Sequence, residues 1–234
     1  MKDAINLMNN TYSKELLTYL LDFISTNKQT KFNEIIQHRT RYLTVVLEDI
    51  YQPHNASAVL RSCDCFGIQD VHIIENQNEY EVNPDVALGS SKWLSLIKYN
   101  GKENNTPAAI KALKEKGYRI VATTPHKNDV NLQELNLEKG PVALVFGTEM
   151  RGLTENALDL ADEFMKIPMY GFTESFNISV SAALSLFHLS EKLRNSQIDW
   201  KLSDEDKIEI KLNWARQAIK KCELLETAFL NNKK

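Results

Sequence analysis

Short apolar runs recur along the middle of the chain, separated by amphipathic segments of helical length. The runs are rich in Val, Ile and Leu and are bounded by polar, glycine or proline residues: 42–47, 71–74, 93–99, 119–122, 142–146 and 164–169. Continuous apolar runs of this length are typical of parallel strands that are covered on both faces. Their alternation with helical segments predicts an α/β fold with a mostly parallel sheet and helices on both faces.

Capping residues indicate where the helices between these strands begin and end. Asn55 is expected to cap a helix that Gly67 ends. Thr106, followed by Pro107, is expected to cap a second helix, and Thr154 a third.

Both ends of the chain carry amphipathic helical patterns outside this alternation. We expect two helices before residue 40, capped by Ser13 and Thr30, and one long C-terminal helix capped by Ser203. The predicted organisation is a helical extension at 1–40, a catalytic domain at 41–195 and a second helical extension at 196–234. The apolar faces of the extensions are expected to dock on this domain or on a second subunit.

The composition is that of an ordinary globular protein, with 43% hydrophobic and 25% charged residues and a net charge of −3. No apolar run is long enough to span a bilayer. The three cysteines have no metal-ligand spacing, which favours reduced thiols in the cytoplasm. The glycines form neither a dinucleotide-binding nor a P-loop pattern.

Polar residues gather where two of the predicted strands end. Glu149 follows one strand, and Ser175 and Asn177 follow another. Ligands of open α/β sheets bind at the carboxyl ends of strands, and Gly147 lets the backbone approach such a ligand closely. For Asn177 taken alone, a cap of the helix that follows it is the better interpretation, and the convergence of several polar residues on one sheet edge favours a site.

Three segments of the sequence match known motifs in the correct order. They are NASAVLRSCDCFG at 55–67, FGTEMRGLTENALDLAD at 146–162 and IPMYGFTESFNISVSAAL at 167–184. Together they resemble the SpoU–TrmH branch of the SPOUT RNA methyltransferases. The resemblance covers roughly 43–193 and is closest to the subgroup of tRNA guanosine-18 2′-O-methyltransferases. It implies a C-terminal trefoil knot that binds S-adenosylmethionine, and transfer of a methyl group to a ribose 2′-hydroxyl.

The resemblance also implies roles for individual residues. The catalytic residues carried over from it are Arg61, Asn55, Glu149, Ser175 and Asn177. The residues expected to bind the cofactor are Thr123, Thr124, Gly147, Ile167, Met169, Phe176 and Asn177. No metal is implied. Glu174 and Phe176 depart from the family pattern, which usually has glutamine and leucine at these positions.

Arg61 is the residue to which the family assigns proton acceptance. A guanidinium remains protonated under ordinary conditions, so Arg61 either accepts the proton in an unusual site or positions a phosphate and stabilises the developing alkoxide. Its helix is largely apolar, which leaves two structural expectations: a buried guanidinium with a partner, or a simple ion pair with Asp64.

A local basic cluster is the expected RNA-binding surface, although the net charge does not favour a nucleic-acid partner. It consists of Lys31, His38, Arg39 and Arg41. The same residues would also suit a solvated helix end. The resemblance implies tRNA as the partner and a homodimer without membrane association. The alternatives are 2′-O-methylation of another tRNA or rRNA site, or a non-catalytic RNA-binding relative.

Overall fold

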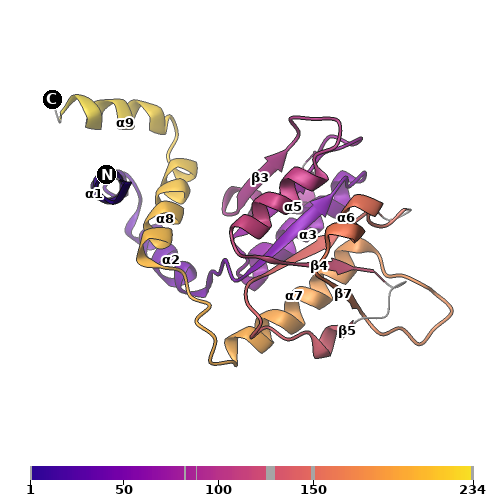
Figure 1. The fold of residues 1–234 in the computed structure, drawn as a ribbon. Coiled ribbons are helices and arrows are strands. Elements are labelled where there is room, and N and C mark those ends of the chain that lie inside the picture. Colours follow the sequence, from indigo (N-terminus) through magenta and orange to yellow (C-terminus); the bar gives the residue numbers. More distant parts are fainter. Residues whose placement is uncertain (1, 82, 88, 125–129, 149–150, 233–234) are drawn as a thin grey trace. The chain divides into compact units, whose positions relative to one another are not determined.

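The computed structural model describes residues 2–81, 83–87, 89–124, 130–148 and 151–232, and it divides the chain into two compact units. One unit combines both ends of the chain, Met1–Arg39 and Lys201–Lys234, and the other is Thr40–Trp200. Figure 1 gives the course of the chain and the element labels.

The second unit is built on a seven-stranded sheet in which every described strand pair is parallel. The strands, in spatial order, are β3 (Ser95–Tyr99), β2 (Asp70–Ile74), β1 (Leu43–Glu48), β6 (Val142–Phe146), β4 (Arg119–Thr123), β7 (Glu163–Lys166) and β5 (Val130–Asn131). Val45 of β1 pairs with Val71 on one side and Leu144 on the other. The predicted mostly parallel sheet is therefore confirmed.

Helices cover both faces of this sheet, because alternate residues of the central strands point to opposite sides. On one face, Leu43, Val45 and Leu144 pack with residues of α3 (Pro53–Phe66) and α7 (Ile178–Arg194). On the other face, Val46 and Val145 pack with residues of α5 (Thr106–Glu115) and α6 (Glu155–Leu160). The short elements of this unit are α4 (Pro84–Ala87), η2 (Ser90–Lys92) and η3 (Leu132–Glu134).

In this unit, some predicted helix ends are confirmed and two helix starts are wrong. Gly67 ends α3 with a left-handed backbone, φ 78°, and Thr154 caps α6 through its side chain. However, α3 begins at Pro53 rather than after Asn55, and α5 includes Thr106 as its first residue. Proline is favoured in the first turn of a helix, so Pro53 moves the start of α3 forward and leaves the Asn55 side chain available for other contacts.

The unit formed by the two chain ends consists of packed helices. They are α1 (Lys2–Leu21), α2 (Thr26–Ile35), η1 (Ile36–His38), α8 (Asp204–Ala218) and α9 (Cys222–Asn231). The predicted starts at Ser13 and Thr30 are wrong. Ser13 lies within α1, and the Thr30 hydroxyl donates to the Thr26 carbonyl inside α2. Ser203 caps α8 as expected.

The predicted single C-terminal helix is interrupted. Its pattern of apolar residues continues through both helices, but the backbone breaks at 219–221, where Lys221 has a φ of 56°. The left-handed conformation of a non-glycine residue ends the regular helix there. No described helix is long and apolar enough to cross a membrane.

The chain turns back close to itself after β6. Thr148 and Gly152 exchange two backbone hydrogen bonds of 2.9 Å, which close a tight loop at the carboxyl end of this strand. The strand order, with β6 between β1 and β4, is consistent with the predicted trefoil knot. The knot itself stays a prediction.

Candidate active site

A cavity of about 340 Å³ opens at the carboxyl ends of β4, β6 and β7. Its size falls within the range of about 300–1,000 Å³ that is usual for small-molecule sites. The lining residues come from these strand ends, from the loop after β6 and from the start of α7: Thr123, Thr124, Phe146, Gly147, Thr148, Arg151, Gly152, Leu153, Leu158, Met165, Lys166, Ile167, Met169, Glu174, Ser175, Phe176, Ile178, Ser181 and Ser185.

Gly147 is required by the close backbone contact that forms one wall of this cavity. A Cβ atom at this position would lie 2.3 Å from the Gly152 carbonyl carbon and oxygen and 2.5 Å from the Leu153 nitrogen. The atoms it would meet are backbone atoms, which cannot swing aside as a flexible side chain can. The wall can therefore form only without a side chain at residue 147.

The buried carboxylate of Glu48 holds the far end of the same loop. Glu48 ends β1 and is 1% exposed. One of its oxygens accepts from the Thr106 hydroxyl at 2.6 Å and the Thr154 hydroxyl at 2.7 Å, and the other accepts from the Thr154 nitrogen at 2.9 Å. Glu48 thereby connects the central strand to the first residue of α5 and to the cap of α6.

The strand ends are joined in a second way beneath the cavity. The Thr123 hydroxyl donates to the Val145 carbonyl at 2.8 Å, and the Thr124 nitrogen donates to the Met165 carbonyl at 3.0 Å. These contacts connect β4 with β6 and β7. They fix the two threonines at the cavity wall.

Asn55 and Asn177 meet beside the cavity although they are far apart in the sequence. Asn177 Nδ2 donates to Asn55 Oδ1 at 3.2 Å, and Asn55 Nδ2 donates to Gln52 Oε1 at 3.0 Å. Asn177 also caps α7, because its Oδ1 accepts from the Ser179 nitrogen at 2.8 Å. The expected helix cap is therefore confirmed, and the role of Asn177 in the site stays a prediction.

The expected cofactor-binding residues line the cavity with one exception. Thr123, Thr124, Gly147, Ile167, Met169 and Phe176 are all lining residues, whereas Asn177 is exposed and is not among them. Of the residues expected to be catalytic, Ser175 lines the cavity. Glu149 lies outside the described residues. The roles of all these residues stay predictions.

Arg61 lies on the exposed side of α3, which corrects the expectation of a buried guanidinium. Its neighbours Val59, Leu60 and Cys63 are fully buried against the sheet, so the helix turns Arg61 away from the core. Within the described part of the chain, Arg61 has no hydrogen-bond or ion-pair partner, and the expected pair with Asp64 is not formed. Its side chain is accessible to a partner from outside the subunit.

The predicted RNA-binding residues fall into two groups. Lys31 and His38 are exposed in the helical unit. Arg39 is only 2% exposed, and its guanidinium carbon lies 5.6 Å from the centre of the Trp214 ring, within the range of a cation–π contact.

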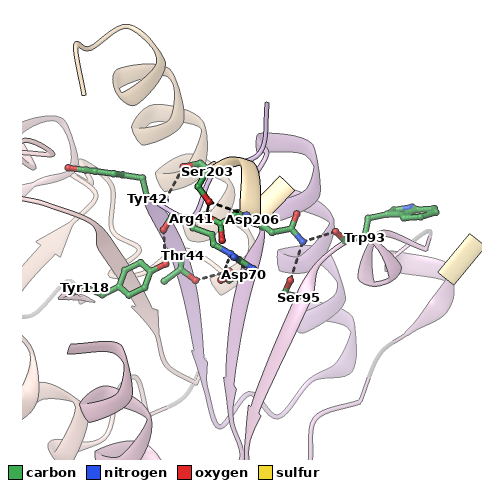
Figure 2. Close-up of polar contacts among 11 residues, drawn as sticks. Arg41, Tyr42, Thr44, Asp70, Trp93, Ser95, Tyr118, Ser203 and Asp206 are labelled. Carbon is green, nitrogen blue, oxygen red and sulfur yellow. Dashed lines mark hydrogen bonds and ion pairs between the residues drawn. The ribbon is translucent and has the colours of Figure 1, made fainter. Parts of the chain in front are cut away.

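Arg41 belongs to a polar network at the amino end of the sheet, shown in Figure 2. Its Nε lies 3.3 and 3.1 Å from the two carboxylate oxygens of Asp70, and its carbonyl accepts from the Tyr118 hydroxyl at 2.6 Å. The Thr44 hydroxyl donates to the Asp70 carbonyl at 2.7 Å. Burial raises the pKa of the Asp70 carboxyl, and the charge of Arg41 opposes that shift. Arg41 thus has a structural partner already.

Several polar residues at the site were not expected from the sequence, among them Glu48, Ser181 and Ser185. Glu48 directly follows the predicted apolar run 42–47. The expectation that polar residues at strand ends form the site, which identified Glu149, would therefore also have found Glu48. Ser181 and Ser185 are spaced by four residues on the apolar α7 and both face the cavity. Polar residues at helical spacing within an apolar stripe were the available signal.

The cavity lies at the carboxyl ends of parallel strands, and one of its walls is formed by closely packed backbone. These features define an α/β protein that binds a small molecule at the carboxyl ends of its strands. The chain belongs to the SpoU rRNA Methylase family, whose model matches residues 42–187.

Relatives and solved structures extend this assignment. A tRNA (guanosine(18)-2′-O)-methyltransferase of Borreliella burgdorferi is 44% identical over 88% of this chain and 93% of its own length. The crystal structure of a TrmH/SpoU tRNA modifying enzyme of A. aeolicus matches with a TM-score of 0.73 at 27% identity, over 83% of this chain and 98% of that one. The methyltransferase AviRb from Streptomyces viridochromogenes, solved in complex with AdoMet, is alike in fold, with a TM-score of 0.58 at 21% identity over 70% and 65% of the two chains.

The close contact of Gly147 with the backbone of Gly152 can be tested by mutation. Gly147→Ala is expected to lower the free energy of unfolding by at least about 2 kcal/mol, because overpacking against backbone typically costs about 1–3 kcal/mol. The midpoint of thermal unfolding should fall by about 2–4 °C for each kcal/mol in a chain of this size. Gly171→Ala is the matched control, since a Cβ there meets no atom within 4 Å. Equal midpoints for the two variants would show that the backbone contact at Gly147 does not exclude a side chain.

Proposed function

We propose that this chain transfers the methyl group of S-adenosylmethionine to the ribose 2′-hydroxyl of guanosine 18 in tRNA. The observation that carries the proposal is the cavity at the ends of β4, β6 and β7, which is lined by six of the residues that the family resemblance assigns to the cofactor. The name of the 44% identical relative, matched over nearly its whole length, supports the choice of substrate. The activity belongs in the cytoplasm, where unfinished tRNA is available.

The residues of the cavity fit S-adenosylmethionine. Gly147 and Gly152 leave bare backbone at one wall, which lets a ligand lie directly against it. Phe146, Met165 and Ile178 supply apolar surface for a nucleoside base. When bound, this group supplies an electrophilic methyl attached to a positively charged sulfur.

The polar cluster beside the cavity orients the residues that meet the substrate. Asn55 is 4% exposed and is held by Gln52 and Asn177, so its position is set by α3 and α7 together. Since Asn177 also caps α7, any shift of Asn55 disturbs the start of the helix that lines the cavity. Ser175, in the preceding loop, presents its hydroxyl at the same edge.

Arg61 acts on the RNA rather than on the cofactor. Its exposed guanidinium can reach a phosphate or the ribose of a substrate that approaches α3. The hydroxyl must pass its proton to an acceptor, here a phosphate oxygen of the RNA, as its oxygen bonds to the methyl carbon and the bond from that carbon to sulfur breaks. A fixed positive charge stabilises the oxygen while its negative charge develops. A guanidinium that stays protonated performs this role without accepting the proton itself.

The helical unit carries the positive charge that attracts tRNA. Residues 1–39 and 201–234 contain thirteen Lys and Arg against ten Asp and Glu, whereas 40–200 contain fifteen against twenty-one. Lys31 and His38 are exposed there and contact phosphates directly. Arg39 and Arg41, which already have partners in Trp214 and Asp70, add positive potential.

A second copy of the chain covers α7. Val180, Leu184 and Phe187 follow one another at helical spacing and are 43%, 40% and 57% exposed. This stripe lies on the helix whose other side lines the cavity, so a homodimer formed through it brings a second subunit next to the site. An apolar stripe of this kind favours burial over exposure to water.

The substrate assignment and Arg61 are tested in one assay. Purified protein with radiolabelled S-adenosylmethionine should methylate a tRNA transcript and fail with the same transcript carrying 2′-deoxyguanosine at position 18. Arg61→Ala should lower the rate of methyl transfer by at least about 100-fold, the scale of losing one group that stabilises developing charge. Binding of S-adenosylhomocysteine, measured by calorimetry, should stay within about twofold, because Arg61 does not line the cavity.

Cys65→Ala is the control for the helix, since Cys65 is exposed on α3 one turn away. Methylation of the deoxyguanosine transcript would refute the assignment of the nucleotide. Unchanged turnover by Arg61→Ala would remove Arg61 from the mechanism.

The RNA-binding surface is tested through its salt dependence. Lys31→Ala should weaken tRNA binding and reduce the slope of log affinity against log salt by about 0.7–0.9, the contribution of one phosphate contact. Fluorescence anisotropy at a series of salt concentrations measures both quantities. Lys111→Ala, whose side chain is 78% exposed on α5, should leave the slope unchanged. Identical slopes for the two variants would take Lys31 off the RNA surface.

The dimer is tested with a charge on the α7 stripe. Phe187→Glu should convert a particle of twice the 26.8 kDa chain mass into one of the single mass, as measured by light scattering. Burying an unpaired carboxylate at an interface is strongly unfavourable. Leu160→Glu, at an exposed apolar position on α6, should leave the mass unchanged. A Phe187→Glu variant that keeps the double mass would show that another surface joins the subunits.

A further inference from the structure

Ser185 is a fully buried residue of α7 whose hydroxyl faces the cavity. Its side chain is 0% exposed, and among the described residues its Oγ has no hydrogen-bond partner. Ser190, one and a half turns further along, is almost as buried, but its hydroxyl donates to the Phe187 carbonyl at 3.2 Å. A serine hydroxyl within this helix can thus donate a hydrogen bond to a backbone carbonyl, but the Ser185 hydroxyl does not.

An unpartnered buried hydroxyl destabilises a protein unless something else supplies the missing hydrogen bond. Buried polar groups without partners are rare, and each one calls for an explanation such as a ligand. Because Ser185 lines the cavity, a molecule in the cavity is within reach of its Oγ. The hydroxyl is therefore available to a ligand.

The polarity of the cavity lining indicates which part of the ligand reaches Ser185. Thr148, Arg151 and Glu174 are polar lining residues with exposed or partly exposed side chains. Phe146 and Met165, which are 2% and 1% exposed, form the buried part of the lining together with Ser185.

S-adenosylmethionine has a charged amino-acid end and an adenine ring with apolar faces and a polar edge. The charged end must stay near water and polar side chains, since burying unpaired charge is far more costly than burying a neutral ring. The adenine consequently occupies the buried part of the cavity.

We propose that the Ser185 hydroxyl forms a hydrogen bond with the polar edge of the adenine ring and contributes to recognition of that base. A serine hydroxyl both donates and accepts, so it can pair with a ring nitrogen or with the 6-amino group. The inference rests on the proposed function, because it takes S-adenosylmethionine as the ligand.

The affinity of Ser185→Ala for S-adenosylhomocysteine tests this role. Calorimetry should show binding about five- to tenfold weaker than that of the unaltered protein, the effect of one lost neutral hydrogen bond. The ligand-free Ser185→Ala protein should unfold at the same temperature or a higher one, because the change removes an unsatisfied buried group. Ser190→Ala, the same chemical change on the same helix, should leave the affinity unchanged.

Ligand analogues identify the atom that Ser185 contacts. Each analogue of S-adenosylhomocysteine lacks one polar atom of the adenine edge: 1-deaza, 3-deaza, 7-deaza and 6-deamino. For one of them, the losses caused by the analogue and by Ser185→Ala should not add, since both remove the same hydrogen bond.

Two results would overturn the role of Ser185: unchanged affinity in Ser185→Ala, or losses that add for all four analogues. Failure of the unaltered protein to bind either S-adenosylmethionine or S-adenosylhomocysteine would instead refute the proposed function.

Discussion

The close passage of the backbone at Gly147 past Gly152 is the constraint on which the site depends. A Cβ at Gly147 would lie 2.3 Å from the carbonyl of Gly152, so only glycine fits at this position. Glu48 secures the other end of this loop through three hydrogen bonds, two of them to Thr154. Steric exclusion at Gly147 and hydrogen bonds to a buried carboxylate at Thr154 therefore position the two ends of this loop beside the cavity.

The site combines groups that are fully satisfied with one that is not. Glu48 and Asn55 are buried and hydrogen-bonded, and they stabilise the arrangement of β1, α3 and α7. Ser185 is buried without a partner among the described residues. Such a division is expected of a binding site, where stability is given up only at the atoms that meet the ligand.

Much of the sheet was predictable from the sequence because continuous apolar runs have one stable environment, between two layers of helices. Gly67, Thr154 and Ser203 were located as helix ends because their local chemistry decides their conformation. Asn55 was misassigned as a cap, since Pro53 sets the start of the helix.

The environment of the arginines was not predictable, because it depends on tertiary packing. Arg61 is exposed where a buried residue was one expectation, and Arg39 is buried where an exposed one was. Local sequence gives the charge of a residue, but the partners of Arg39 and Arg41 are Trp214 and Asp70, which lie far along the chain.

The strand order has a further effect during synthesis. Leu43 of β1 pairs with Val142 of β6, and α1 packs on α8. A nascent chain on the ribosome therefore has unpaired strand edges and an uncovered helix until its last segments emerge. Assembly of the sheet and of the helical unit therefore waits for segments that are synthesised late, unlike assembly of a protein built from local contacts.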